Sequence, residues 1–147
     1  MVYPMKFLDF INELFDKPFK FKRKVGTQNS VVYSFISGNA DFKIIVYHIT
    51  GKQGDGLEVI FQKNGSEGID PSDEPFRVFA TVKEALYDSE VEYKDYVTFG
   101  AKSDEPSRVS LYNKFAKLVK KELKFEDIEI NKSGRYVEYT IWKNKDH

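Results

Sequence analysis

The chain contains, from residue 96 to residue 112, the run Tyr96-Val-Thr-Phe-Gly-Ala-Lys-Ser-Asp-Glu-Pro-Ser-Arg-Val-Ser-Leu-Tyr112. Its first part, Tyr96 to Ala101, is rich in residues that favour strands, and Lys102 to Ser107 is a polar, acidic loop. From Arg108 to Leu123 the apolar residues recur at helical spacing, and lysines occupy the opposite side. The run therefore predicts a strand, a loop and an amphipathic helix.

The same patterns extend outward on both sides of this run. Before it we predict a helix over Met5 to Phe15, then four strands over Phe19 to Val25, Val31 to Ser37, Phe42 to Thr50 and Leu57 to Gln62, and then a helix over Phe76 to Ser89. After it we predict a hairpin of two strands, Phe125 to Ile130 and Tyr136 to Trp142. Because a helix links the fourth and fifth strands, those two can lie parallel. We expect one α+β domain over residues 1–147, with a mixed, mostly antiparallel sheet of about six to seven strands flanked by three helices.

Composition and charge narrow the classes of protein to consider. The 23 basic and 23 acidic residues cancel, so the chain lacks the net field that draws proteins to nucleic acid. With no cysteine there is no thiolate nucleophile and no cysteine zinc site. The first fifteen residues lack the apolar core of a signal peptide, and no stretch approaches 18 apolar residues. We expect a cytoplasmic protein that binds neither membrane nor nucleic acid.

A heptapeptide occurs twice, each time directly before a predicted helix. Ser72-Asp-Glu-Pro-Phe-Arg-Val78 and Ser103-Asp-Glu-Pro-Ser-Arg-Val109 agree at six of seven positions. One interpretation is helix capping, because Ser and Asp accept free N–H groups and Pro suits a first turn. The other is a shared site, since both helix starts would face one crevice at the carboxyl edge of the sheet. There Arg77 and Arg108 would attract an anion, and Glu74 and Glu105 would oppose it.

The order of elements from the second strand onward resembles the GNAT superfamily of N-acetyltransferases, whose fourth and fifth strands are parallel and separate to admit acetyl-CoA. The superfamily often carries Asn-x-x-Ala-x-x-Leu-Tyr-x-Lys-x-Gly-Phe at its last helix, and Leu111, Tyr112 and Lys114 match it. The resemblance implies a ligand or acyl donor bound between the fourth and fifth strands. It also implies that Tyr112 protonates the departing CoA thiolate as a general acid. A base on or near the fourth strand would be Glu58 or Glu67.

The phosphate-binding pattern of that superfamily, Gln/Arg-x-x-Gly-x-Gly/Ala, has no clean copy here. Gln62 to Glu67 departs at its last position, and Arg77 to Val82 replaces both glycines. The sequence therefore leaves open whether the chain binds acetyl-CoA as a cofactor. The ligand-binding candidates are those near the two repeated loops: Arg77, Thr81, Ser107, Arg108, Glu74 and Glu105.

The run Ala101 to Tyr112 is also similar to small bacteriophage proteins of unassigned function. That likeness implies an alternative, a non-enzymatic viral protein that engages a host protein in the host cytoplasm through its acidic loops.

The chain contains only two histidines, His48 and His147. It therefore has too few histidines for a multi-histidine metal site, and a Ser-His-Asp arrangement is not expected. We expect no metal site, and whether the chain is an enzyme stays open.

Overall fold

The computed structural model describes residues 17–68, 74–102 and 106–147, without the side chains of residues 101 and 107. Its elements are β1 (Lys22–Thr27), β2 (Ser30–Ser37), β3 (Ala40–Gly51), β4 (Gly54–Lys63), β5 (Ser66–Glu67), α2 (Pro75–Asp88), the 3₁₀ helix η1 (Val91–Tyr93), β6 (Tyr96–Lys102), α3 (Pro106–Leu123), β7 (Asp127–Ser133) and β8 (Tyr136–Trp142). The predicted strands and the two later helices are present, with β5 and η1 added, but the strand predicted over Phe19 to Val25 begins only at Lys22 and the one predicted over Phe125 to Ile130 is shifted to Asp127–Ser133. The helix predicted over Met5 to Phe15 lies outside the described residues, so the described part has two α-helices where three were expected.

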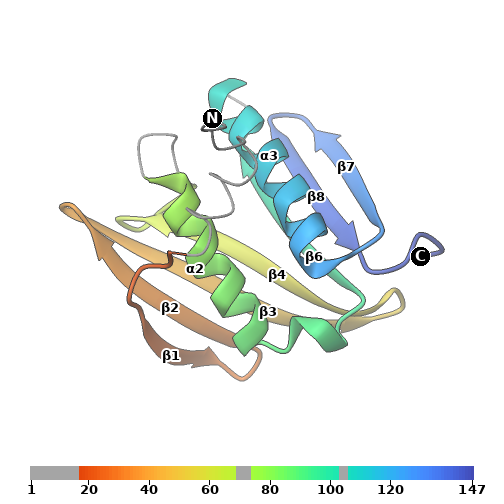
Figure 1. Cartoon of the computed structure of the whole chain (residues 1–147), viewed down its shortest axis with the longest axis horizontal. Coiled ribbons are helices and arrows are strands. Elements are labelled where there is room, and N and C mark those ends of the chain that lie inside the picture. Colours follow the sequence, from red (N-terminus) through yellow and green to blue (C-terminus); the bar gives the residue numbers. More distant parts are fainter. Residues whose placement is uncertain (1–16, 69–73, 103–105) are drawn as a thin grey trace, which may run out of the picture.

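The strands form one open sheet in the order β1-β2-β3-β4-β6-β8-β7, and the short β5 pairs with β4. The β4–β6 pair is parallel, and the other neighbouring pairs are antiparallel. The mixed, mostly antiparallel sheet predicted from the sequence is therefore confirmed, with eight strands instead of six to seven. In Figure 1 the half built from β1 to β4 and the half built from β6, β8 and β7 point in different directions from their common junction.

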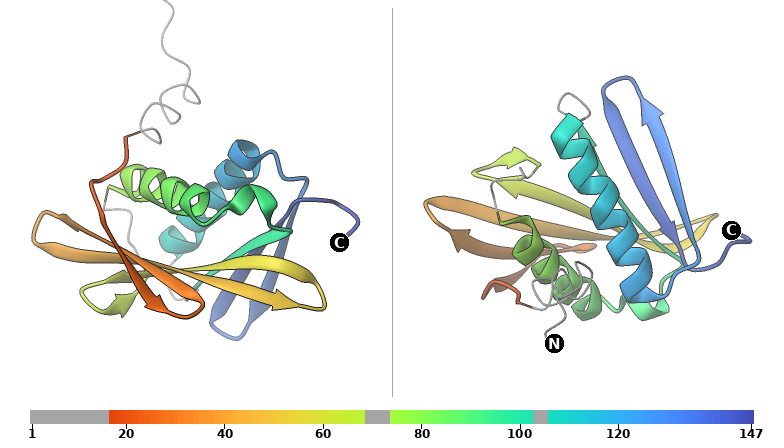
Figure 2. Two further views of the ribbon diagram at one scale, coloured as in Figure 1. Left: turned by 90° about the horizontal axis from the view of Figure 1, so that it is seen from below. Right: turned by 45° about the horizontal axis from the view of Figure 1, so that its top comes forward.

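Alternation along the strands produces two different faces. In β3 the side chains of Phe42, Ile44 and Val46 are buried in the core, whereas their neighbours Ile45 and Tyr47 are only partly buried and point the other way. Both described helices lie on the core side, with α2 over β3 and α3 over β6, β7 and β8 (Figure 2). We call the opposite side the helix-free face, a term that covers the described residues only.

Aromatic packing holds the helices against each other and against the sheet. The rings of Phe79 on α2 and Phe115 on α3 stack with centroids 3.8 Å apart. Phe61 on β4 meets both rings edge-on, at 6.4 Å and 6.0 Å. One cluster therefore joins two helices and a central strand, and such aromatic pairs contribute about 0.5–1.5 kcal/mol beyond their buried area.

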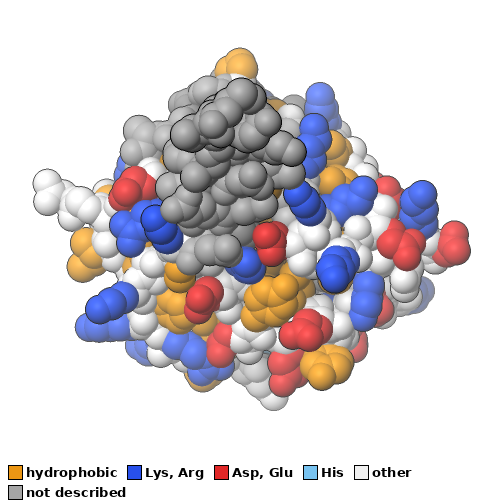
Figure 3. All heavy atoms as spheres, viewed as in Figure 1, with side chains coloured by type: hydrophobic (Ala, Val, Ile, Leu, Met, Phe, Trp, Pro, Cys, Tyr) orange, Lys and Arg blue, Asp and Glu red, His pale blue; other side chains and the backbone are white. Residues whose placement is uncertain are grey.

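The outer surfaces are charged, as the sequence predicts. On α3 the lysines opposite the buried face, Lys114, Lys117 and Lys121, are exposed, and so is Lys124 directly after the helix. Figure 3 shows Lys and Arg side chains interspersed with Asp and Glu on the helix side of the molecule. Strand β1 is one of the two edge strands, and Arg23 on it pairs with Asp88 at 2.7 Å. Among the described residues no helix is both long enough and apolar enough to cross a membrane.

Candidate functional site

The parallel ladder between β4 and β6 is short. It runs from Gly56 opposite Tyr96 to Val59 opposite Phe99, although β4 continues to Lys63 and β6 to Lys102. Beyond those four pairs the two strands separate (Figure 1), and β5 pairs with the end of β4 instead. We call this place the β4–β6 opening, bounded by residues 60–63 and 100–102. It lies at the carboxyl ends of two parallel strands, where open α/β sheets commonly bind ligands.

Two of the predicted site residues meet at this opening. The N–H of Gly68 donates to the carbonyl of Phe61 at 2.8 Å, which brings the end of β5 over the end of β4. A Cβ placed on Gly68 would lie 3.5 Å from the Arg108 guanidinium and 3.8 Å from the Tyr112 hydroxyl. Gly68 has a φ of +105°, in the region that favours glycine, so its backbone passes beside both groups in a conformation that other residues rarely adopt.

The Tyr112 ring is fixed from several sides. It is 0% exposed, stacks on Phe61 with centroids 5.8 Å apart, and meets Phe99 edge-on at 6.2 Å. Phe61 and Phe99 belong to β4 and β6, so the ring lies between the two diverging strands on the core side. The hydroxyl position is therefore set by both halves of the sheet.

Three other predicted site residues belong to a different cluster. Arg77 lies with its guanidinium 3.9 Å from the centre of the Phe19 ring, donates from Nε to the Lys17 carbonyl at 3.3 Å, and has Nη1 3.9 Å from Glu74. Thr81 is 0% exposed; its hydroxyl accepts from the Phe19 N–H at 2.9 Å and donates to the Arg77 carbonyl at 2.8 Å. These contacts attach residues 17–19 to α2.

The repeated loops are only partly within the described residues. Glu74 occupies the N-cap position of α2 with φ 51° and ψ 58° and makes no side-chain cap hydrogen bond; instead it accepts from the Ser37 hydroxyl at 3.1 Å. Pro75 and Pro106 each begin a helix, as the capping interpretation predicts. Glu105, the side chain of Ser107, and most of the acidic residues of both loops lie outside the described residues. The predicted shared crevice between the loops stays a prediction.

A second feature is a hollow on the helix-free face, at the amino ends of β4 and β6. Its volume is about 890 Å³, and its lining includes Glu58, Thr98, Glu138 and Thr140. Thr98 donates to the Tyr139 carbonyl at 3.0 Å, and its hydroxyl lies 3.4 Å from that of Thr140. The hollow is thus floored by satisfied hydroxyls and rimmed by carboxylates.

Glu58 is the carboxyl group that this hollow perturbs. Its side chain is half-buried, and this burial, with repulsion from Glu138 and Glu67, raises the pKa of the Glu58 carboxyl. Glu67, by contrast, is exposed. The two base candidates, equivalent in the sequence, are therefore different in the structure. Glu58 and Tyr112 lie on opposite sides of the sheet, because Glu58 points to the helix-free face.

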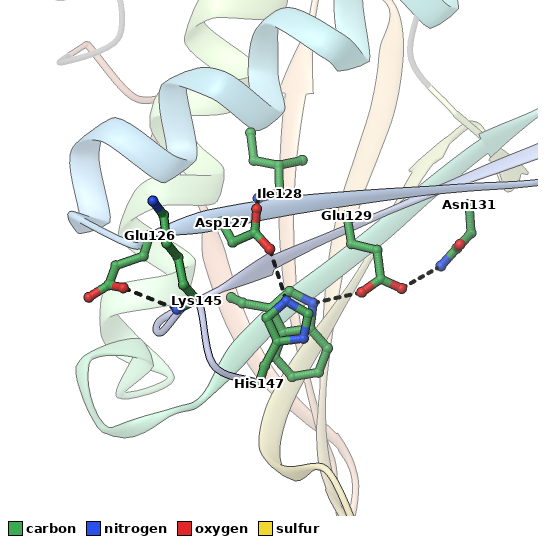
Figure 4. A network of polar contacts seen from close by, with 8 residues as sticks. Glu126, Asp127, Ile128, Glu129, Asn131, Lys145 and His147 are labelled. Atoms are coloured by element: carbon green, nitrogen blue, oxygen red, sulfur yellow. Dashed lines mark hydrogen bonds and ion pairs between the residues drawn. The ribbon is translucent and has the colours of Figure 1, made fainter.

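Aromatic rings close one end of the hollow. The Tyr96 ring covers the backbone of Gly56, where any side chain would overlap it, and its centroid is 4.9 Å from that of Trp142. The indole N–H of Trp142 donates to Glu129 at 3.2 Å, and the Asn131 amide donates to the same carboxylate at 3.0 Å (Figure 4). The Glu129 carboxylate therefore accepts both hydrogen bonds and holds the Trp142 ring in place.

The last residues pack back onto the start of β7 (Figure 4). The His147 ring stacks on Trp142 at 4.1 Å, and its Nε2 lies 2.9 Å from Asp127 Oδ2. The hydrogen bond from His147 lowers the pKa of the Asp127 carboxyl. The Lys145 N–H donates to Glu126 at 3.0 Å. Nothing in the sequence pattern indicated this network, because its partners come together only through the β7–β8 hairpin and the turn after it.

Comparison with protein-family models, with curated proteins and with solved structures finds no match to this chain. Within the described ranges no group of three or more His, Asp or Glu side chains has the arrangement of a metal site.

Proposed function

We propose that this chain binds a ligand at the β4–β6 opening, in a GNAT-like arrangement, and that the chemistry at this place is acyl transfer. The observation that carries the proposal is the parallel ladder that ends at Val59 and Phe99 while both strands continue. Parallel strands that separate and are followed by helices leave their carboxyl ends free for a ligand.

Tyr112 is the group that would take part in the chemistry. Its hydroxyl is directed to the neighbourhood of Gly68 and Arg108 at the opening, and its ring is fixed between Phe61 and Phe99. A phenol held in one place can donate a proton to a leaving group without a cost of reorganisation. This position supports the role of general acid.

The described residues do not fit the phosphates of acetyl-CoA. A phosphate cradle needs free N–H groups at a helix start, but α2 begins with Pro75, which has none, and Glu74 precedes it with a negative charge. Arg77 is engaged with Phe19 and Lys17. The proposal therefore concerns the acyl thioester end of a donor and excludes a phosphate cradle at α2.

Thermal shift experiments with two donors test this. Acetyl-CoA and a short acetyl thioester without phosphates, such as S-acetyl-N-acetylcysteamine, should each raise the melting temperature. A ligand at 100 times its dissociation constant stabilises the fold by about 2.7 kcal/mol. If the opening is the site, the shift should be smaller in Tyr112→Phe, which keeps the ring and removes the hydroxyl.

Tyr139→Phe is the matched control. Tyr139 is also 0% exposed, but its hydroxyl is directed to the Val109 carbonyl at 3.4 Å. Its ligand-induced shift should equal that of the unmodified chain. No shift with either donor would contradict acyl-donor binding, and equal losses in the two variants would contradict a site at Tyr112.

A further inference from the structure

The helix-free face carries apolar side chains that no described element covers. Its central strands present six of them: Val32, Ile36, Ile45, Tyr47, Ile49 and Ile60. They point away from α2 and α3, and none belongs to the core cluster or packs against it. Five of them are partly exposed, and Ile36, which the Ser34–Lys43 pair separates from the others, is 69% exposed. Apolar side chains that lie together on an exposed sheet face usually mark a contact surface.

Two basic side chains, Lys22 and Lys24, border this apolar area on β1, and a third, Lys43, lies on the central strand β3. The register places Lys22 opposite Ser34 and Lys24 opposite Val32, with Lys43 on the far side of Ser34, so all three lysines share the helix-free face. All three are exposed, and within residues 17–68, 74–102 and 106–147 they form no ion pair or side-chain hydrogen bond. Their positive charges are therefore available to a binding partner.

Acidic side chains border the same area on the other side. Glu67 is opposite Gln62 on β5, and Glu58 and Glu138 line the hollow, all on the helix-free face. In the described part of the chain neither Glu58 nor Glu138 has a cationic partner. Lys52 is the lysine at the rim of the hollow. The face is thus mainly basic at β1, apolar in the centre and mainly acidic beyond β4, and Asp41 and Lys102 are the exposed residues of opposite sign on the two sides.

We propose that this face is the contact surface of a two-fold symmetric dimer of the chain, with the basic side of each copy over the acidic side of the other. A two-fold axis parallel to the central strands reverses the strand order of the second sheet, so β1 of one copy faces the β8–β7 side of its partner. Such an interface needs a self-complementary patch, and here one face holds both complementary charges and the apolar centre. Two sheets can pack face to face at about 10 Å.

A second copy explains the face better than an unrelated partner does. A purely basic partner would match the acidic side and would leave Lys22, Lys24 and Lys43 facing like charges. The chain itself supplies both signs in the needed order. The arrangement leaves Tyr112 on the opposite side of the sheet, so the dimer is independent of the proposed ligand site.

Sedimentation velocity on the full chain tests the proposal. The mass should change from one chain to two as the concentration rises from about 1 μM to about 300 μM, a range that brackets the weak-to-moderate affinity of small interfaces. The dimer should weaken between about 50 mM and about 500 mM salt, because salt screens the charged borders.

Charge reversal gives the decisive comparison. Lys22→Glu with Lys24→Glu makes both borders acidic, and Glu67→Lys with Glu138→Lys makes both borders basic. Each double variant alone should lose at least about tenfold in dimer affinity, which is about 1.4 kcal/mol. A mixture of the two variants should form a one-to-one dimer again, because each now supplies the sign that the other lacks.

Lys114→Glu with Lys117→Glu is the matched control, since it makes the same charge change on the exposed side of α3. It should leave the self-association unchanged. A chain that stays monomeric over the whole range would overturn the proposal. So would charge-reversed variants that associate as before, a mixture that does not associate, or a monomer that binds only a different protein through this face.

Discussion

At the scale of single residues, the contact around Asp88 depends on pH. The Tyr33 hydroxyl donates to this carboxylate, and Arg23 Nε donates to the same oxygen at 2.7 Å. The hydrogen bond from Tyr33, followed by that from Arg23, lowers the pKa of the Asp88 carboxyl. Tyr33 is 0% exposed on β2 and Asp88 ends α2, so this contact ties the helix to the edge of the sheet.

Tyr33→Phe should therefore lower the free energy of unfolding in a pH-dependent way. A carboxyl whose folded pKa is depressed stabilises the fold above its unfolded pKa of about 3.9 and loses that contribution as the pH falls through the folded pKa. Since Asp88 is partly exposed, we expect a loss of about 1 kcal/mol at pH 7 and a smaller loss near pH 3, measured by urea unfolding. Tyr47→Phe, on the helix-free face, should show no such pH dependence. An equal loss for Tyr33→Phe at both pH values would argue against the bond to Asp88.

At the scale of elements, the stacked rings of Phe79 and Phe115 link α2 and α3. The ion pair between Lys83 and Glu122, at 3.1 Å, joins the same two helices. The aromatic pair is buried, whereas the ion pair is partly exposed to solvent. The rings should therefore contribute more than the ion pair, for which exposed examples give about 0–1 kcal/mol.

A double-mutant cycle measures this link. Phe79→Leu and Phe115→Leu should each destabilise by about 1–3 kcal/mol, and their combined effect should fall short of the sum by about 0.5–1.5 kcal/mol. Phe115→Leu combined with Phe35→Leu is the comparison, because Phe35 stacks with Phe19 and Phe42 instead. Its effects should add. Additivity in the first cycle as well would show that the stacked geometry contributes nothing of its own.

At the scale of the whole molecule, two half-sheets are joined by the four-pair ladder of β4 and β6. Strands β3 and β4 have long antiparallel partners on at least one side, whereas β1 and β7 are edges. The residues of β1 are all exposed. Local opening should therefore begin at the edges and reach the junction last.

Hydrogen exchange followed by mass spectrometry tests this order. Peptides covering β1 and β7 should exchange earliest among the strands, and peptides covering residues 56–59 and 96–99 should be among the last. Saturating the β4–β6 opening with a donor should slow exchange in residues 60–68, beyond the ladder. Protection of β1 equal to that of β3 would contradict this order.

Much of the fold was predictable because local patterns report local structure. The alternation in Phe42 to Thr50 and the helical spacing in Arg108 to Leu123 depend only on which side chains are buried, and both elements form where predicted. The helix between the fourth and fifth long strands indicated that the two can lie parallel, and they do. The outer position of the strand after Phe19 was indicated by its lysines.

The sequence by itself thus determined the long strands, the two later helices, their order along the chain and the mixed sheet, since each of these depends on neighbours along the chain. Only the tertiary structure decided how distant side chains meet. It engaged Arg77 and Thr81 with residues 17–19, brought Tyr112 to Gly68, and made Glu58 different from Glu67 by burying it in a hollow between β4 and β6. The reason is physical: a period of two separates the faces of a strand, but burial and charge at one position depend on strands that pair through long-range register.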